Sequence, residues 1–128
     1  MKSLVILKPD AIHRNLFKEF CEYIKEHEFE IDNYEIIHKP SIKLIDAHYS
    51  DHITQDWYAK LRRYMSTGPI ILIAIDCADL AMLNKLRHIS LLFRAKYQIN
   101  HTYNTIHCSD SEESAIKELN IWGKYDNE

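Results

Sequence analysis

The sequence is poor in the residues that mark domain boundaries and disulfide frameworks. It has only two glycines, Gly68 and Gly123, in 128 residues, so few positions suit a flexible linker between domains. Its three cysteines are odd in number and include no CxxC pair, which fits a reducing compartment better than a disulfide framework. We therefore expect a single domain over residues 1–128 and a cytoplasmic protein.

Long apolar runs and a strong excess of one charge are also missing. The N-terminus has only a short apolar run, Leu4 to Leu7, before Lys8, which is too short for a signal peptide or a membrane span. The formal net charge is −3, which argues against binding to nucleic acid by bulk charge. We expect no membrane and no nucleic-acid partner, although a local cluster of Lys and Arg could still bind phosphate.

The apolar residues that are present, 46% of the chain, suffice for one core. The four-residue spacing of Ile12, Leu16, Phe20 and Ile24 predicts a packed helix, which Asp10 would cap. The expected strands are 4–7, 29–37, 70–75 and 104–108. The other expected helices are 42–49, 57–65, 80 to about 87, and 109–122, the last opened by an S-x-x-E capping box. This alternation indicates one sheet covered by helices, in an α/β or α+β protein.

Two groups of cationic residues suit phosphate binding. Lys8 precedes Pro9 and Asp10 where a strand gives way to a helix, and backbone N–H groups at such a turn attract phosphate. A solvated lysine beside a turn proline is the alternative. Arg87 and Arg94 flank an apolar patch, and guanidinium groups bind phosphate oxygens in a planar, two-pronged way. Surface salt bridges are the alternative there.

His107 is the candidate nucleophile. It ends a short apolar run just before the helix that carries Glu118. An imidazole becomes a good nucleophile at one nitrogen when the other donates to an acceptor that fixes the tautomer. Glu118 or a backbone carbonyl could be that acceptor, and a purely structural histidine is the alternative.

Two further patterns give weaker indications of function, one of a redox switch and one of a metal site. Cys108 adjoins His107, which raises the idea of a redox switch, but we expect a buried, inert thiol because reactivity requires a stabilised thiolate. His48 and His52 have a helical spacing that could bind a metal. Two histidines without further ligands nearby are more typical of surface residues.

Five segments in this order resemble the nucleoside diphosphate kinase family: LVILKPDAI, HYSDH, YMSTGPI, RAKYQ and NTIHCSDSEESAIKELNIW. The resemblance covers residues 4–122, and N-x-x-H-x-S-D-S ahead of an amphipathic helix is that family's signature. It implies an α+β fold, a ferredoxin-like sandwich in which helices cover one face of a four-stranded antiparallel sheet.

The resemblance also assigns roles to individual residues. His107 matches the residue that accepts the phosphoryl group, Glu118 the carboxylate that orients its ring, and Ser109 a supporting serine. Asn104 matches the residue that binds the sugar and phosphate end of the nucleotide, and Trp57 an aromatic residue that stacks on the base. Four side chains match the family's phosphate contacts: Lys8, Tyr49, Arg87 and Arg94. The resemblance also places Lys8 and Tyr49 in the catalytic set with His107 and Glu118.

The activity implied is transfer of the γ-phosphate of a nucleoside triphosphate to a nucleoside diphosphate, by a ping-pong mechanism through phosphohistidine at His107. Mg²⁺ is the expected cofactor, held by the nucleotide phosphates and not by protein ligands. The expected partners are nucleoside di- and triphosphates and further copies of the chain, in a hexamer or a tetramer.

Several departures from the family keep a second hypothesis open. The segment between Arg87 and Arg94 is much shorter than the family's loop, as in some viral members. The family's phosphate-contacting threonine has no clear counterpart there, and Ser90 is a candidate for its place. Ala95 and Cys108 replace family glycines, and residues 102–103 replace a Gly-Arg pair. The alternative is a catalytically silent nucleotide-binding or scaffold protein. A sequence-specific nucleic-acid binder is a third hypothesis, which no basic stripe or motif supports.

Overall fold

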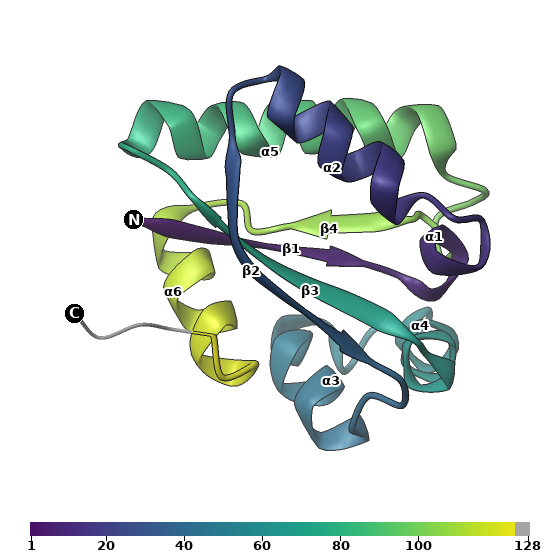
Figure 1. Cartoon of the computed structure of the whole chain (residues 1–128). Coiled ribbons are helices and arrows are strands. Elements are labelled where there is room, and N and C mark those ends of the chain that lie inside the picture. The colour runs from purple at the N-terminus through teal and green to yellow at the C-terminus, as the bar shows by residue number, and fades with distance from the viewer. Residues whose placement is uncertain (125–128) are drawn as a thin grey trace.

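A four-stranded antiparallel sheet forms the centre of the protein in a computed structural model that describes residues 1–124 (Figure 1). The strands are β1 (Lys2–Leu7), β2 (Glu30–Ile37), β3 (Ile70–Asp76) and β4 (Ile106–Cys108). Their order in the sheet is β2-β3-β1-β4, and every neighbouring pair is antiparallel. This confirms the predicted ferredoxin-like α+β fold.

Helices lie on both faces of the sheet. They are α1 (Pro9–His13), α2 (Phe17–Glu26), α3 (Ile42–His48), α4 (Tyr58–Thr67), α5 (Leu80–Tyr97) and α6 (Glu112–Ile121), with a 3₁₀ turn at Ser50–His52. Helices α2 and α5 cover one face, and α3, α4 and α6 cover the other (Figure 1). None of the helices described is long and apolar enough to cross a membrane.

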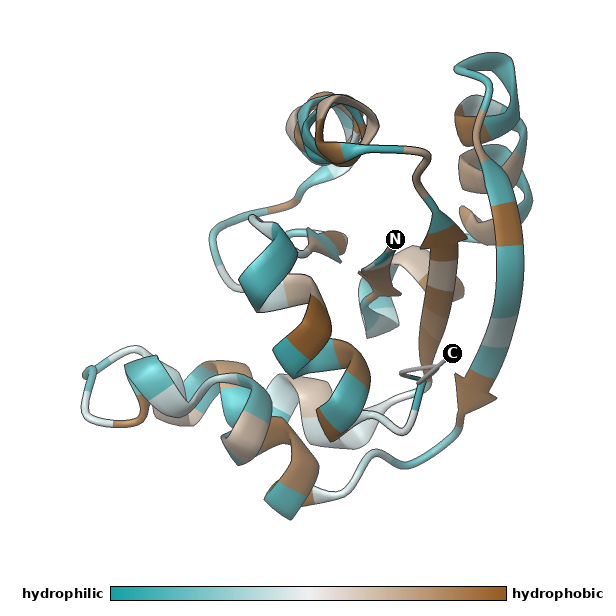
Figure 2. Ribbon diagram, turned by 90° about the vertical axis from the view of Figure 1, so that its left-hand side faces the viewer, coloured by the Kyte–Doolittle hydropathy of each residue, from teal (hydrophilic) through white to brown (hydrophobic). Residues whose placement is uncertain are grey.

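The expectation of helices on one face was therefore wrong, and the central strands show why. On β1, Val5 and Leu7 pack in the core with α2 and α5, whereas Leu4 and Ile6 pack in the core with α3, α4 and α6. Side chains alternate along a strand, so a continuous apolar run requires cover on both faces. Strand β3 is likewise apolar along almost its whole length, whereas the edge strand β2 is mostly hydrophilic (Figure 2).

The first predicted helix is interrupted. Helix α1 ends at His13, Asn15 adopts a left-handed φ of 59°, and α2 starts at Phe17. Asp10 is not a cap, because it lies inside α1 and Lys8 occupies the N-cap position. The Asp10 carboxylate instead accepts hydrogen bonds from Thr105, 95 residues away in the chain.

Helix α5 does not end near Arg87 as expected. It starts after Asp79, whose side chain accepts the Met82 N–H at 2.9 Å, and it continues to Tyr97. The predicted end followed the polar pair Arg87-His88, but Ile89 and Phe93 continue the buried face of the same helix. The segment between Arg87 and Arg94 is therefore helix and contains no loop.

The N-cap of the last helix lies two residues later than predicted. Ser111, not Ser109, is the N-cap of α6, and its side chain accepts the Ser114 N–H. The S-x-x-E pattern indicated the helix correctly but not the capping residue. Ser109 is thereby left free to contact the site.

Candidate active site

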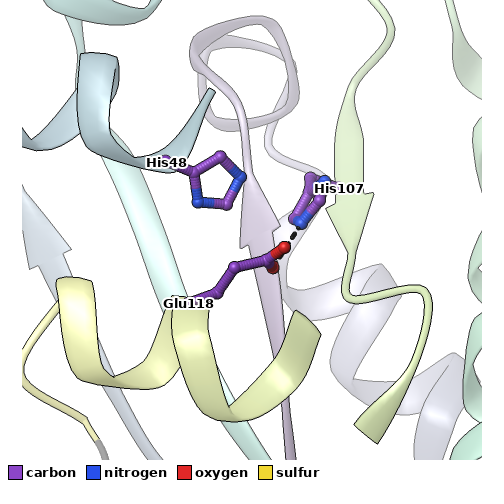
Figure 3. A group of neighbouring side chains, drawn as sticks. All are labelled: His48, His107 and Glu118. Carbon is purple, nitrogen blue, oxygen red and sulfur yellow. Dashed lines mark hydrogen bonds and ion pairs between the residues drawn. The ribbon is translucent and has the colours of Figure 1, made fainter. Parts of the chain in front are cut away.

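The sheet places His107 beside helix α6. In β4, His107 pairs with Ile6 of the neighbouring strand β1, while Ile106 and Cys108 turn toward the core under α5. The alternation along the strand directs His107 to the opposite face, where Glu118 of α6 meets it. Nε2 of His107 lies 2.7 Å from Oε1 of Glu118 (Figure 3).

The Glu118 carboxylate determines which nitrogen of His107 carries the proton. Burial alone would raise the pKa of Glu118, but the hydrogen bond and charge of His107 outweigh it and hold this pKa below its ordinary value. An ionised carboxylate only accepts hydrogen bonds, so Nε2 of His107 carries the proton. The other nitrogen, Nδ1, then holds a lone pair that is available for attack.

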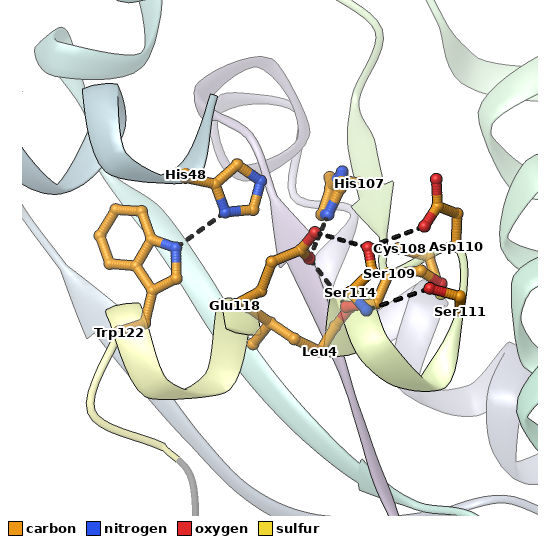
Figure 4. A network of polar contacts seen from close by, with 10 residues as sticks. All are labelled: Leu4, His48, His107, Cys108, Ser109, Asp110, Ser111, Ser114, Glu118 and Trp122. Atoms are coloured by element: carbon orange, nitrogen blue, oxygen red, sulfur yellow. Dashed lines mark hydrogen bonds and ion pairs between the residues drawn. The ribbon is translucent and has the colours of Figure 1, made fainter. Parts of the chain in front are cut away.

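Ser109 steadies this carboxylate. Its Oγ is buried and donates to Oε1 of Glu118 at 2.8 Å, and it also lies 3.4 Å from the Leu4 carbonyl oxygen (Figure 4). Ser114, one turn before Glu118, approaches the other carboxylate oxygen at 3.4 Å. The carboxylate is therefore held from β4, from α6 itself and from the segment between β4 and α6.

His107 also lines a cavity of about 590 Å³. That volume lies in the range of small-molecule sites. The cavity combines cationic, aromatic and polar side chains with one aliphatic side chain, and its lining residues are Lys8, Tyr49, His52, Trp57, Leu61, Arg94, His101, Thr102, Asn104 and His107. Most of the predicted nucleotide contacts thus meet around one hollow.

Lys8 is buried in the wall of this cavity. Its Nζ donates to Oδ1 of Asn104 at 2.6 Å, and Nδ2 of Asn104 donates to the His101 carbonyl at 3.1 Å. Burial, helped by the charge of Arg94 and opposed by that of Asp10, lowers the pKa of Lys8 from 10.5 to about 7. An anion that enters the cavity would relieve this repulsion.

Arg87 and Arg94 share one face of α5. They lie seven residues, or about two helical turns, apart, and both line a smaller hollow of about 150 Å³ together with His107. Arg94 lines both hollows, whereas Arg87 lines only the smaller one. Ser90, between them on α5, is buried and its Oγ has no hydrogen-bond partner within residues 1–124.

Tyr49 presents an unsatisfied hydroxyl in the same region. Its OH is buried without a hydrogen-bond partner among the residues described, and burial strongly raises its pKa. A buried donor without a partner is costly. A ligand oxygen in the cavity would satisfy it, so the neutral hydroxyl of Tyr49 suits donation of a hydrogen bond to an acceptor such as phosphate.

Trp57 stands at the mouth of the cavity. Its side chain is 49% exposed, and its ring lies 5.3 Å from the ring of His52. An exposed indole at a cavity rim offers a π-face to a planar ligand. Every residue of the predicted site is therefore at or next to the two hollows, with Glu118 and Ser109 behind His107.

His48 is the site residue that the sequence interpretation placed wrongly. It is buried at the end of α3, and its ring meets the His107 ring edge-on, with centroids 4.6 Å apart at 79°. Its Nδ1 accepts the indole N–H of Trp122 at 3.0 Å (Figure 4). The H-x-x-x-H spacing suggested His52 as the partner of His48, and no sequence pattern connects His48 with Trp122.

The cluster of His48, His107 and Glu118 has the composition of a metal site, with potential ligand atoms within 4.8 Å of one another. The hydrogen bond from Trp122 opposes this use. An indole nitrogen only donates, so Nδ1 of neutral His48 is unprotonated and Nε2 carries the proton. A protonated nitrogen cannot bind a metal, so these residues do not fit one.

Asp10 and Thr105 were also missed. Thr105 precedes β4 with a φ of +77°, which is strained for a β-branched residue. The Asp10 carboxylate accepts its N–H at 3.1 Å and its hydroxyl at 2.8 Å, and Tyr64 donates to the same carboxylate. This network fixes the backbone between Asn104 and His107.

Cys108 behaves as expected for an unreactive thiol. It is half-buried, and burial raises its pKa to about 12. The thiolate fraction is therefore negligible near neutral pH. We assign no redox role to this residue.

Comparisons with known proteins agree with the geometry. Residues 1–127 match the family model of nucleoside diphosphate kinase. The nucleoside diphosphate kinase of Acanthamoeba polyphaga mimivirus is 33% identical over 127 residues, covering 94% of this chain and 91% of the relative. That of Thermoanaerobacter sp. strain X514 is 29% identical over 128 residues, covering 94% of each.

Solved structures share the fold. The nucleoside diphosphate kinase of Encephalitozoon cuniculi superposes with a TM-score of 0.85 at 22% identity, covering 99% of this chain and 91% of the other. That of Aquifex aeolicus superposes with a TM-score of 0.81 at 20% identity, covering 98% and 95%. The chain belongs to the nucleoside diphosphate kinase family, whose members are phosphotransferases.

Proposed function

We propose that this chain is an active nucleoside diphosphate kinase that transfers the γ-phosphate of a nucleoside triphosphate to a nucleoside diphosphate through phosphohistidine at His107. One observation carries the proposal. Glu118 holds Nε2 of His107 at 2.7 Å while the same imidazole lines a cavity with Lys8 and Arg94. A nucleophile with a fixed tautomer and two nearby cations suits phosphoryl transfer.

The reaction consists of two in-line displacements. In the first, the lone pair on Nδ1 of His107 forms a bond to the γ-phosphorus, and the bond from that phosphorus to the β–γ bridging oxygen breaks. The nucleoside diphosphate leaves with that electron pair. In the second, a terminal oxygen of another nucleoside diphosphate attacks the phosphorus, and Nδ1 recovers its lone pair. This is ping-pong chemistry.

The cations stabilise the charge that develops on the phosphoryl oxygens. Lys8 and Arg94 line the larger cavity, and Arg87 approaches His107 from the smaller hollow. Preorganised charges of this kind stabilise a transition state without reorganisation at the moment of reaction. The unsatisfied hydroxyl of Tyr49 adds a neutral donor.

The nucleoside binds at the other side of the cavity. The indole of Trp57 stacks on the base, and Asn104 contacts the sugar and phosphate end. Stacking uses the π-face that every base has. We therefore expect broad base tolerance.

We propose Mg²⁺ as the cofactor. The described residues that line the larger cavity include no carboxylate, whereas Mg²⁺ prefers carboxylate and phosphate oxygens. The larger cavity therefore fits an ion that arrives on the nucleotide phosphates and has no protein cage of its own there. When bound there, the ion neutralises phosphate charge.

We also propose a homo-oligomer, a hexamer or a tetramer. Strand β2 is the last in the sheet order, and it exposes Tyr34 and Ile36. Unpaired strand edges with apolar side chains favour association. Light scattering of the purified protein tests this, and a monomer at micromolar concentration would contradict it.

Labelling tests the proposed reaction directly. The protein is incubated with γ-labelled ATP and Mg²⁺, and acid-labile label is expected on His107, with transfer to an added nucleoside diphosphate. His107→Ala should bind ADP but carry no label. A wild-type chain that binds ADP without taking up label would favour the catalytically silent alternative.

A further inference from the structure

His48 and Trp122 form a buried pair directly behind the nucleophile. His48 ends α3, and Trp122 follows α6, so the hydrogen bond between them joins elements that are 74 residues apart. Both side chains are at least nine-tenths buried. Neither residue lines the larger cavity, so neither is positioned to touch the base or the sugar.

Trp122 dictates where the proton of His48 lies. The indole Nε1 can only donate, so Nδ1 of His48 must be the acceptor at 3.0 Å. Neutral imidazole carries one proton, which therefore lies on Nε2. The opposite tautomer would place two donors against each other in a buried site, which is costly.

The protonated nitrogen of His48 faces the catalytic pair. Figure 4 shows Nδ1 turned to Trp122 and the other ring nitrogen on the side of His107 and Glu118. One nitrogen of each histidine and a carboxylate oxygen of Glu118 lie within 4.8 Å of one another. No hydrogen bond joins the two imidazoles in the described part of the chain, but a lone pair on that nitrogen of His48 would attract the Nε2–H of His107 away from Glu118 and so turn the His107 ring.

We propose that Trp122 and His48 are positioning residues for the nucleophile. Trp122 keeps the proton of His48 on Nε2, and His48 in that form leaves Glu118 as the acceptor for the Nε2–H of His107. The ring of His107 therefore keeps one orientation, with Nδ1 free for attack on phosphorus. The catalytic consequence rests on the proposed function, but the tautomer of His48 does not.

The charges around His48 favour its neutral form. The pKa of His48 is lowered to about 3, mainly by burial. His107 of β4, Lys8 after β1 and Lys117 of α6 contribute to the lowering, while Glu118 of α6 opposes it. Tyr49, the neighbour in the chain, packs edge-on against the ring. His48 is therefore neutral across the physiological pH range, and its tautomer is the property that matters.

Nitrogen NMR of the wild-type protein tests the first step without reference to activity. Long-range ¹H–¹⁵N spectra distinguish protonated from unprotonated ring nitrogens, and the His48 signals are those missing from His48→Phe. We expect His48 to show a protonated Nε2 and a bare Nδ1 at pH 6 to 8. A protonated Nδ1, or a mixture of tautomers, would overturn the proposal.

A double-mutant cycle tests the second step. Trp122→Phe keeps an aromatic ring but removes the indole N–H, and His48→Phe keeps a ring without donor or acceptor. In the wild-type background, Trp122→Phe should slow phosphoenzyme formation by about three- to tenfold, the tautomer preference that one hydrogen bond provides. In the His48→Phe background, the same change should have no effect.

The alternatives give different results. If Trp122 served only packing, Trp122→Phe would slow the reaction equally in both backgrounds, and the proposal would fail. If the wild-type protein forms no phosphohistidine, the proposed function fails instead. The NMR spectra then still decide the first step, since Trp122→Phe should shift the proton of His48 from Nε2 toward Nδ1.

Discussion

The buried ammonium of Lys8 predicts that nucleotide binding takes up protons. Burial and Arg94 lower the pKa of Lys8 to about 7 in the free protein. At pH 8, about nine in ten molecules would therefore hold a neutral Lys8. Phosphate oxygens beside Nζ favour the charged form, so binding should return a proton to the amine.

Calorimetry measures this uptake. ADP is titrated at pH 8 into protein in two buffers with different ionisation enthalpies, and the difference in binding heat gives the number of protons taken up. We expect close to one proton at pH 8 and almost none at pH 6. The affinity for ADP should fall about tenfold per pH unit above pH 7, because the protonated fraction of Lys8 falls at that rate.

Lys8→Met is the matched control, since it keeps the length of the side chain and removes the amine. It should abolish the proton uptake and flatten the pH dependence. An equal uptake in Lys8→Met would assign the proton to another group and refute the reasoning. So would the absence of uptake by the wild-type protein at pH 8.

The same pKa predicts how the stability of the nucleotide-free protein changes with pH. Between pH 7 and pH 10.5 an unfolded Lys8 holds its proton and the folded one does not, so the unfolded state binds more protons. Stability then rises with pH in this window, by up to about 1.4 kcal/mol per pH unit from this group. Urea unfolding of the wild type and Lys8→Met at pH 7 and pH 9 isolates the contribution.

Three further changes test the rest of the site. Glu118→Gln, compared with the exposed Glu112→Gln, should slow phosphorylation of His107 by about 10- to 100-fold, since misorientation of a reacting group has effects of that size; equal rates for the two variants in quench-flow would contradict it. Thr105→Gly should be more stable to heat than Thr105→Ala by about 1 kcal/mol, because both lose the hydroxyl bond to Asp10 but only Gly relieves the positive φ. Trp57→Ala should weaken binding of purine and pyrimidine nucleotides alike by about 1–3 kcal/mol, and a loss confined to one base class in equilibrium titrations would disprove simple stacking.

Local patterns in the sequence predicted the parts of the molecule whose cause is local. The apolar run Ile70 to Ile75 is a strand because both of its faces are covered, and the segment around His107 has a motif specific enough to indicate the family. The spacing of Leu86 and Phe93 already continued the buried face of α5. The predicted end at Arg87 was therefore wrong for a reason that the sequence itself contained.

Other features depend on contacts that no local pattern encodes. The Trp122–His48 hydrogen bond spans 74 residues, and the Asp10–Thr105 contacts span 95. Asp10 resembles a helix cap because its neighbours open a helix, but the strand order brings Thr105 within reach of its carboxylate. The tertiary fold thus gives Asp10 a different role from the helix cap that its local sequence indicated.

The continuity of helix α5 changes what the short segment between Arg87 and Arg94 implies for phosphate binding. Had that segment been a loop, each arginine could have moved independently toward a phosphate, at an entropic cost on binding. On one helix their Cα separation is fixed by two turns, and the buried Ile89 and Phe93 anchor the helix between them. The two guanidinium groups are therefore partly preorganised, and the loss of a loop need not imply the loss of phosphate binding. This favours the active kinase over the silent scaffold on physical grounds, because preorganised charge is what phosphoryl transfer requires.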